Sequence, residues 1–222
     1  MKAAIIRFPG SNCDRDTVHV LADVKRIQTD LVWHNDFKDG SYDAVILPGG
    51  FSFGDHLRAG AIAAHSPAMK TICHMAKEGK PVLGICNGFQ ILIETGLLPG
   101  SLLRNASLKF VCKWVDLRIE NTSSAFTSAF DKNSRAWMPI AHNEGRFFGE
   151  DDLLEQLEAD GRVVMRYVGE NPTGTSRGIV AVSNEERNVV GMMPHPERAS
   201  DLALGGTDGL KVFQSMVDWI QC

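Results

Sequence analysis

Short, continuous apolar segments that end in glycine-containing turns constrain the fold of this chain more than any other feature. Residues 44–47 are four consecutive apolar residues, and residues 81–85 form a second such run that includes one glycine. These runs lack the alternation of a half-exposed strand and suit strands that are covered on both faces. Strands of this kind occur mainly in parallel sheets. The sequence therefore predicts an α/β fold with a mainly parallel, doubly wound sheet and helices on both faces.

The remaining pattern predicts strands and helices in alternation through the first half of the chain. Further strands are predicted at residues 2–8, 28–33, 138–141, 162–168, 178–182 and 189–192. Helices are predicted between 66 and 79 and at 87–95, 151–159 and 208–220, and an earlier one ends near residue 23. Residues 108–120 alternate apolar and polar side chains, as in a half-exposed antiparallel strand. We therefore expect an antiparallel extension beyond the parallel half, with a hairpin turn at residues 183–188.

Length and charge limit the class of protein. The chain has 222 residues, with 23 basic and 27 acidic side chains, so its formal charge is −4. No broad positive surface is expected, and neither nucleic acid nor an anionic membrane is a predicted partner. The apolar residues 3–6 are too few for a signal peptide, and no uncharged run approaches the ~20 residues of a membrane-spanning helix. We expect a cytoplasmic protein that folds as a single domain over residues 1–222.

The five cysteines are widely separated and form no CxxC pair. This spacing argues against a disulfide framework and against a zinc site, so no metal is predicted. At least one cysteine is free to act as a working thiol. The cysteines are Cys13, Cys73, Cys86, Cys112 and Cys222.

Cys86 stands between a predicted strand and a predicted helix. Gly84-Ile85-Cys86-Asn87-Gly88 has the form G-x-C-x-G, the cysteine counterpart of the nucleophile elbow of hydrolases. A sharp strand-to-helix turn pushes the central side chain out at the carboxyl edge of the sheet. The positive end of the helix dipole then favours the thiolate, which is the species that attacks a carbonyl carbon. The alternative is that Cys86 is an inert, buried cysteine.

His195 is the predicted base for this thiol. It stands in Met193-Pro194-His195-Pro196-Glu197-Arg198, directly after a predicted strand. Because a residue before proline is driven into extended backbone, we expect the whole segment to be extended. Side chains two apart then project to the same side, so that Glu197 can orient the His195 imidazole. The predicted catalytic set is Cys86, His195 and Glu197; the alternative is a surface histidine in a proline-rich turn.

Backbone amides near Cys86 complete the predicted chemistry. Gly49 and Gly50 follow the predicted strand 44–47, and loops at the carboxyl ends of parallel strands converge on one crevice. The N–H groups of Gly50 and Asn87 are therefore candidates for an oxyanion hole, which stabilises the negative oxygen formed when a thiolate attacks an amide. A flexible turn at the end of a strand is the alternative explanation of the two glycines.

Together these segments resemble the glutaminase domains of the class I glutamine amidotransferases. That family carries G-x-C-x-G, an oxyanion strand ending in P-G-G, and a late H-P-E, and here these are residues 84–88, 48–50 and 195–197. The match spans the whole chain in the expected order. The resemblance implies a flavodoxin-like sheet and a cysteine-dependent glutaminase that hydrolyses glutamine to glutamate and ammonia.

Four longer segments are similar to one group of this family, the glutaminase subunits of phosphoribosylformylglycinamidine synthases of purine biosynthesis. They are residues 8–14, 48–55, 84–90 and 141–146. The resemblance implies a separate synthetase subunit and a small third subunit as partners. It also implies that the synthetase uses the ammonia, with ATP and Mg²⁺, to convert formylglycinamide ribonucleotide to formylglycinamidine ribonucleotide. No cofactor is expected in this chain, which carries no G-x-x-x-x-G-K-[ST] phosphate loop.

The resemblance also assigns residues around the nucleophile. It implies that Gly49 and Gln90 help to hold the substrate glutamine, while an ordinary helix position explains Gln90 almost as well. His142, Glu144 and Arg146 stand in a polar segment and would line the site or face the synthetase. A solvated loop explains the same composition.

The sequence leaves other activities open. They are the glutaminase of another amidotransferase, a cysteine hydrolase of a related fold, and a scaffold that keeps the fold without catalysis. The related hydrolases lack the late His-Pro-Glu segment, and the complete set of Cys86, His195 and Glu197 argues against a scaffold. Phe53 and His56 stand where the family leads us to expect tyrosines, which leaves the contacts of that loop open.

Overall fold

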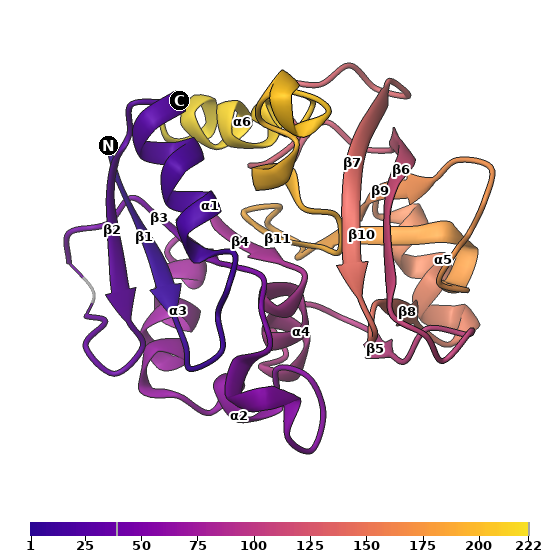
Figure 1. Ribbon diagram of the computed structural model, residues 1–222, viewed down its shortest axis with the longest axis horizontal. Helices are drawn as coiled ribbons and strands as arrows, with labels where there is room; N and C mark the ends of the chain where they lie inside the picture. The colour runs from indigo at the N-terminus through magenta and orange to yellow at the C-terminus, as the bar shows by residue number, and fades with distance from the viewer. Residues whose placement is uncertain (39, 222) are drawn as a thin grey trace.

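The computed structural model describes residues 1–38 and 40–221, and Figure 1 shows how its strands and helices are arranged. A nine-stranded sheet has the order β2-β1-β3-β4-β11-β10-β9-β6-β7, and β5 pairs with β8. The strands are β1 (Lys2–Arg7), β2 (Gln28–Trp33), β3 (Ala44–Leu47), β4 (Val82–Ile85), β5 (Ser101–Leu103), β6 (Val111–Ile119), β7 (Arg135–His142), β8 (Arg146–Phe148), β9 (Val163–Tyr167), β10 (Ile179–Ser183) and β11 (Val189–Met192). The α-helices are α1 (Asp14–Val18), α2 (Ala61–Ala64), α3 (Pro67–Lys77), α4 (Asn87–Glu94), α5 (Asp151–Ala159) and α6 (Leu210–Gln221).

Strands β2, β1, β3, β4 and β11 run parallel. The chain steps from β1 outward to β2 and then from β3 in the other direction to β4. Because crossovers between parallel strands are right-handed, α1 and α3 must lie on opposite faces of the sheet. Figure 1 shows α1 in front of the parallel strands and α3 behind them. The predicted doubly wound sheet with helices on both faces is confirmed.

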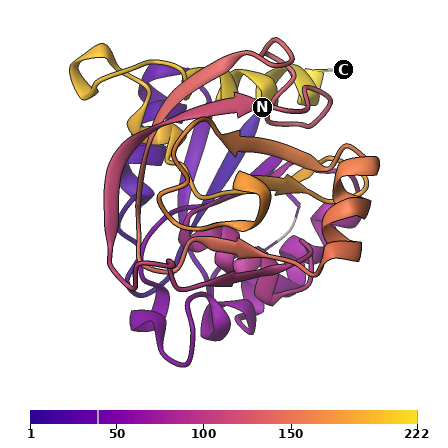
Figure 2. The same cartoon turned by 90° about the vertical axis from the view of Figure 1, so that its right-hand side faces the viewer.

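The other half of the sheet is antiparallel, as the alternation in residues 108–120 predicts. The neighbouring pairs β11–β10, β10–β9, β9–β6 and β6–β7 are all antiparallel. Figure 2 shows these strands on the side of the molecule away from β1 and β2. Strand β7 is longer than predicted because its alternating residues pair with β6 from Arg135 onward. Pro139 is tolerated within it because β7 is the last strand of the sheet, where a missing N–H breaks no ladder.

The first helical region departs from the sequence prediction. The helix expected to reach residue 23 is α-helical only to Val18 and continues as a π-helix over His19–Val24. The Lys25 N–H donates to the Val20 carbonyl, five residues earlier, at 2.9 Å. Hydrophobic periodicity does not distinguish this wider turn from an ordinary one. None of the helices in residues 1–38 and 40–221 has the length and apolar character that crossing a bilayer requires.

Close backbone contacts fix the turn between β4 and α4. Both β4 and β11 are buried along their whole length. A Cβ added at Gly88 would overlap the Leu47 carbonyl oxygen of β3, and one at Gly84 would lie 2.6 Å from the Gly88 carbonyl. Helix α4 therefore approaches β3 and β4 more closely than any side chain on Gly88 allows. The two glycines of G-x-C-x-G are required by packing.

We expect Gly88→Ala to destabilise the protein by about 1–3 kcal/mol, because the added methyl group meets backbone that cannot rotate away. Urea unfolding followed by circular dichroism measures the change. Gly206→Ala is the matched control, since the nearest atom to its Cβ is an ordinary 3.4 Å away on the Trp114 ring. Equal stability of the two variants would contradict the packing account.

Candidate active site

Cys86 lies at the tip of the turn between β4 and α4. Its backbone has φ 50° and ψ −102°, a strained conformation for a residue with a side chain. The Cys86 N–H donates to the Met192 carbonyl of β11 at 2.7 Å, which ties the turn to the strand before His195. The side chain is buried, and its sulfur lies 3.8 Å from the Ala141 carbonyl oxygen. The elbow predicted from sequence is therefore present at Cys86.

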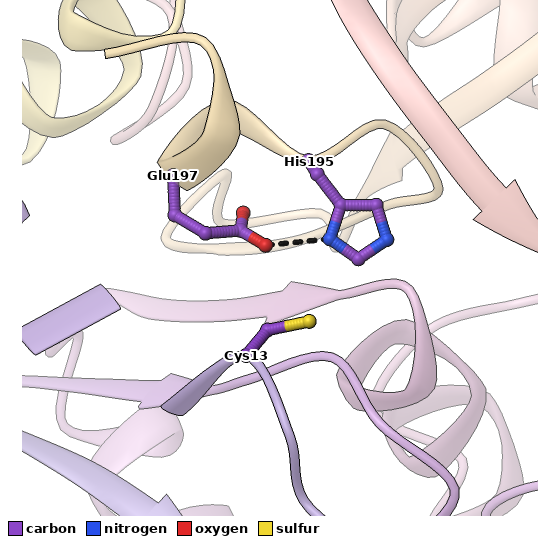
Figure 3. Close-up of side chains that lie close together, drawn as sticks. All are labelled: Cys13, His195 and Glu197. Carbon is purple, nitrogen blue, oxygen red and sulfur yellow. Dashed lines mark hydrogen bonds and ion pairs between the residues drawn. The ribbon is translucent and has the colours of Figure 1, made fainter. Parts of the chain in front are cut away.

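His195 follows β11 and is held from two sides. Its N–H donates to the Pro139 carbonyl of β7 at 2.8 Å, and its Nδ1 lies 2.5 Å from Glu197 Oε1 (Figure 3). The predicted extended segment is wrong beyond His195, because Pro196–Arg198 forms a 3₁₀ helix. Proline's fixed φ suits the first position of a helix, and only the residue before it stays extended. This short turn, and not an extended strand, brings Glu197 to the imidazole.

The surroundings of His195 favour its protonated form. Burial alone would lower the pKa of His195, but the Glu197 carboxylate and the sulfurs of Cys13 and Cys86 outweigh it and hold that pKa well above its ordinary value. His195 Nε2 is buried and has no hydrogen-bond partner among the described residues. Cys86 and His195 also line one cavity of about 90 Å³. The structure thus brings together all three residues of the predicted catalytic set.

Cys13 is a second thiol beside the imidazole, and sequence reasoning missed it. Figure 3 shows its sulfur directed toward the His195–Glu197 pair. The Arg198 guanidinium donates to this sulfur at 3.1 Å, and the thiol donates to Asn12 Oδ1 at 3.1 Å. Burial raises the pKa of Cys13, against the opposing effect of His195. A signal existed, because Cys13 follows the carboxyl end of β1, at the edge where the loops of β3 and β4 also meet.

The Cys13, His195 and Glu197 side chains form a possible metal-binding group, with ligand atoms within 4.8 Å of one another. Two features oppose a cation there. His195 Nδ1 is already engaged with Glu197, and the positive Arg198 guanidinium contacts the Cys13 sulfur. The group is accounted for by hydrogen bonding within the chain.

The two residues predicted to supply an oxyanion hole lie close to Cys86, because Asn87 follows it and Gly50 lines the same cavities. Asn87 is the first residue of α4, where N–H groups have no partner within the helix. Gly50 pairs with Ser11 in an isolated bridge whose hydrogen bonds come from the neighbouring residues. Within residues 1–38 and 40–221, neither amide donates to another protein group. A Cβ at Gly49 would lie 2.7 Å from the His195 ring and 3.1 Å from the Cys13 sulfur, so Gly49 lets that ring approach β3.

Comparison with known proteins agrees with this geometry. Residues 1–220 match the CobB/CobQ-like glutamine amidotransferase domain. The chain belongs to that family. A chain of the "Structure of PurLQS from Thermotoga maritima" is 47% identical with a TM-score of 0.91, and the match covers 99% of this chain and 98% of that one. A glutamine amidotransferase from Thermotoga maritima is 17% identical with a TM-score of 0.61, covering 100% of this chain and 99% of that one, and shares the fold.

In this amidotransferase a second cavity of about 260 Å³ opens beside Cys86. Gln90, predicted to hold substrate, lines it and is itself held in place. Its side-chain carbonyl accepts from Asn87 Nδ2 at 2.8 Å, and its amide nitrogen donates to the Glu144 carbonyl at 2.6 Å. Asn87 Oδ1 in turn accepts from the Ser52 N–H at 3.1 Å. Side-chain amides thus connect α4 to the two loops that form the cavity walls.

Two of the three residues predicted to line the site or face a partner line the cavity. His142 and Glu144 line the 260 Å³ cavity, while Arg146 lies on β8 and donates to the Gly174 carbonyl at 3.1 Å. His142 is buried, and this burial, with the positive charge of His195, lowers the pKa of His142 to about 3. The imidazole of His142 is therefore neutral at physiological pH.

Asp55 lies in the wall of this cavity, and its pKa is raised above the ordinary value of an aspartate. Burial, and next the negative charge of Glu144, raise the pKa of Asp55 to about 6. Asp55 is in the loop after Gly50 and has φ 53°, a left-handed conformation that aspartate tolerates better than most residues. Above pH 6 the fold therefore holds a half-buried negative charge whose cost no group of the described chain offsets.

We expect Asp55→Asn to stabilise this amidotransferase at pH 8 by on the order of 1 kcal/mol, a figure reduced for partial solvent exposure. The folded pKa lies above the unfolded value of 3.8, so the charge penalty is complete above pH 6 and disappears as the pH falls toward 3.8. Urea unfolding at pH 8 and pH 4 checks this. Asp152→Asn, on the exposed face of α5, serves as the control and should show no such pH-dependent gain.

Proposed function

We propose that this chain is the glutaminase subunit of a phosphoribosylformylglycinamidine synthase. The observation that carries the chemistry is the Cys86 thiol at a strained turn, lining one cavity with an imidazole that Glu197 orients. The observation that supports the pathway is 47% identity over almost the whole length of a chain of PurLQS. The whole chain acts as one glutamine amidotransferase domain.

The reaction divides into two steps. His195 takes the Cys86 proton, and the thiolate attacks the side-chain carboxamide carbon of glutamine, while the Gly50 and Asn87 amides stabilise the oxyanion. The imidazolium protonates the departing nitrogen, so the C–N bond breaks and ammonia leaves a glutamyl thioester. His195 then deprotonates water, which attacks the thioester and releases glutamate and the thiol. Glutamine is the only organic reactant, and no cofactor of this chain takes part.

Cys86 is assigned as the nucleophile in preference to Cys13 for three reasons. Cys86 stands at the amino end of α4, whose dipole favours a thiolate, and beside both oxyanion amides. It lines the 260 Å³ cavity, and Cys13 does not. The pKa of Cys13 is raised by burial, which favours an unreactive thiol. Cys13 packs against the imidazole and, with Arg198, positions it.

The ammonia is used by a separate synthetase subunit, with a small third subunit completing the assembly. In this proposal the synthetase binds ATP, Mg²⁺ and formylglycinamide ribonucleotide. Transfer along a shielded path is required because ammonia released to water at neutral pH is protonated and loses its nucleophilic lone pair. The complex works in the cytoplasm, where the free thiols of Cys13, Cys73, Cys86 and Cys112 stay reduced.

The reconstituted complex tests the function. With ATP and formylglycinamide ribonucleotide, Cys86→Ala should lower glutamine-dependent product formation by about a thousandfold or more and leave ammonia-dependent formation unchanged. Cys112→Ala, at an exposed thiol on β6, is the matched control and should keep both activities. Glutamine-dependent synthesis by Cys86→Ala at the wild-type rate would refute the assignment.

A glutamine-analogue electrophile distinguishes the two thiols beside His195. We expect 6-diazo-5-oxo-L-norleucine to add covalently to Cys86, located by peptide mass mapping, because only that sulfur faces the substrate cavity. Cys13→Ala should still be labelled, more slowly, because the imidazole loses a packing partner. A label on Cys13, or labelling of Cys86→Ala, would reverse the assignment.

A further inference from the structure

The groups around the Cys86 sulfur favour an anion. His195 carries a positive charge because its pKa is held well above the ordinary value, and Cys86 stands at the amino end of α4. The product glutamate ends in a carboxylate, whereas the substrate glutamine ends in a neutral carboxamide of nearly the same shape. These groups alone would therefore hold the product more tightly than the substrate. A group in the cavity wall that only accepts hydrogen bonds would reverse this preference.

His142 ends β7 beside the nucleophile. The preceding residue, Ala141, has its carbonyl oxygen 3.8 Å from the Cys86 sulfur. Cys86 and His142 both line the 260 Å³ cavity. A Cβ at Gly145 would overlap the His142 ring, so glycine at this position lets the ring lie where it does. The imidazole is therefore fixed in the cavity wall close to the reacting sulfur.

Asn105, which is fully buried, fixes the tautomer of His142. Asn105 Nδ2 donates to the Lys109 carbonyl at 3.0 Å and to the His142 carbonyl at 2.9 Å. Asn105 Oδ1 accepts from the Gly145 N–H at 3.3 Å, so reversing the side-chain amide would place its oxygen against two carbonyls. The 3.2 Å contact from Asn105 Oδ1 to His142 Nδ1 therefore requires the imidazole proton on Nδ1.

The other ring nitrogen of His142, Nε2, is left with a free lone pair. The side chain is 2% exposed, and Nε2 has no hydrogen-bond partner in the part of the chain that the structure describes. Burial and the positive charge of His195 lower the pKa of His142 to about 3, so Nε2 gains no proton at physiological pH. A buried acceptor without a donor is costly, and a ligand that brings an N–H group removes that cost. The wall thus presents an acceptor that cannot act as a donor.

Resting on the proposed function, we propose that His142 Nε2 accepts an N–H of the substrate carboxamide and so makes the site select glutamine over glutamate. With the carboxamide oxygen at the Gly50 and Asn87 amides, its nitrogen lies on the other side of the reacting carbon. There the His142 lone pair meets an N–H of glutamine but would meet a lone pair of the glutamate carboxylate. The same hydrogen bond holds the leaving nitrogen while His195 protonates it, and the product is repelled after hydrolysis.

Ligand binding to the full chain tests this separately from catalysis. In the Cys86→Ala background, calorimetry compares glutamine with glutamate at neutral pH. Glutamine should bind about 10- to 100-fold more tightly than glutamate. His142→Phe should lower this ratio by about tenfold, because the phenyl ring fills similar space with no lone pair. A role of His142 in packing alone would weaken both ligands equally and leave the ratio unchanged.

A second variant keeps the test decisive if His142→Phe does not fold. In His142→Gln the terminal amide accepts from glutamine or turns to donate to glutamate. Affinity for glutamine should therefore stay within about threefold, while glutamate should bind about tenfold more tightly. His74→Phe, at an exposed histidine of α3, is the matched control and should leave the ratio unchanged.

The leaving group provides a kinetic readout in the reconstituted complex. The γ-methyl ester of glutamate acylates a cysteine as glutamine does, but its leaving group has no N–H. His142→Phe should therefore lower kcat/KM for hydrolysis of glutamine by about tenfold more than for the ester. An equal loss with both substrates would overturn the proposal.

The binding results also give outcomes against the proposal. They are an unchanged ratio of glutamine to glutamate affinity in the His142 variants that fold, and an absence of glutamine binding by both the chain and its complex. Failure of the proposed function shows separately, because the Cys86→Ala synthesis assay depends on formylglycinamide ribonucleotide as acceptor and the binding ratio does not.

Discussion

Two ionisable side chains, the imidazole of His195 and the carboxylate of Glu197, lie together in the interior, and the site is arranged around that pair. Their side chains are 2% and 0% exposed. A charge on either group without the other would be strongly destabilising at that depth, because packing does not offset the burial of an unpaired charge. The Glu197 carboxylate also raises the pKa of His195 against the lowering effect of burial. The protonation state of His195 therefore depends on its surroundings in the fold as well as on the imidazole itself.

Much of the site followed from sequence because its residues stand at fixed distances from strand ends. In a parallel sheet, the residue after each strand reaches the same edge, so the positions of Gly50, Cys86 and His195 in the chain determine that they meet. Gly84 and Gly88 also mark the site, because a glycine is required at both positions only where backbone segments pack closely. The parallel half and its antiparallel extension were predicted from the same kinds of pattern.

What the sequence did not reveal depends on contacts across the chain. The position of Cys13 after β1 places it at the right edge of the sheet, but its contact with a histidine 182 residues later depends on the pairing of β1 with β3. The raised pKa of Asp55 depends on the burial of its carboxylate, which the sequence does not reveal. The sequence predicts an extended segment there because proline restricts the residue before it. Proline also favours the first position of a helix, and this second effect produces the 3₁₀ turn after His195.

Pro139 links the outermost strand to the centre of the molecule. The edge strand of a sheet can pair with a strand of another chain, and a proline in it removes one N–H group that such pairing would use. The same residue gives its carbonyl to the backbone of His195. Because the acceptor is a backbone carbonyl, a replacement of Pro139 would keep the bond to His195 and return only an N–H group to the edge of the sheet.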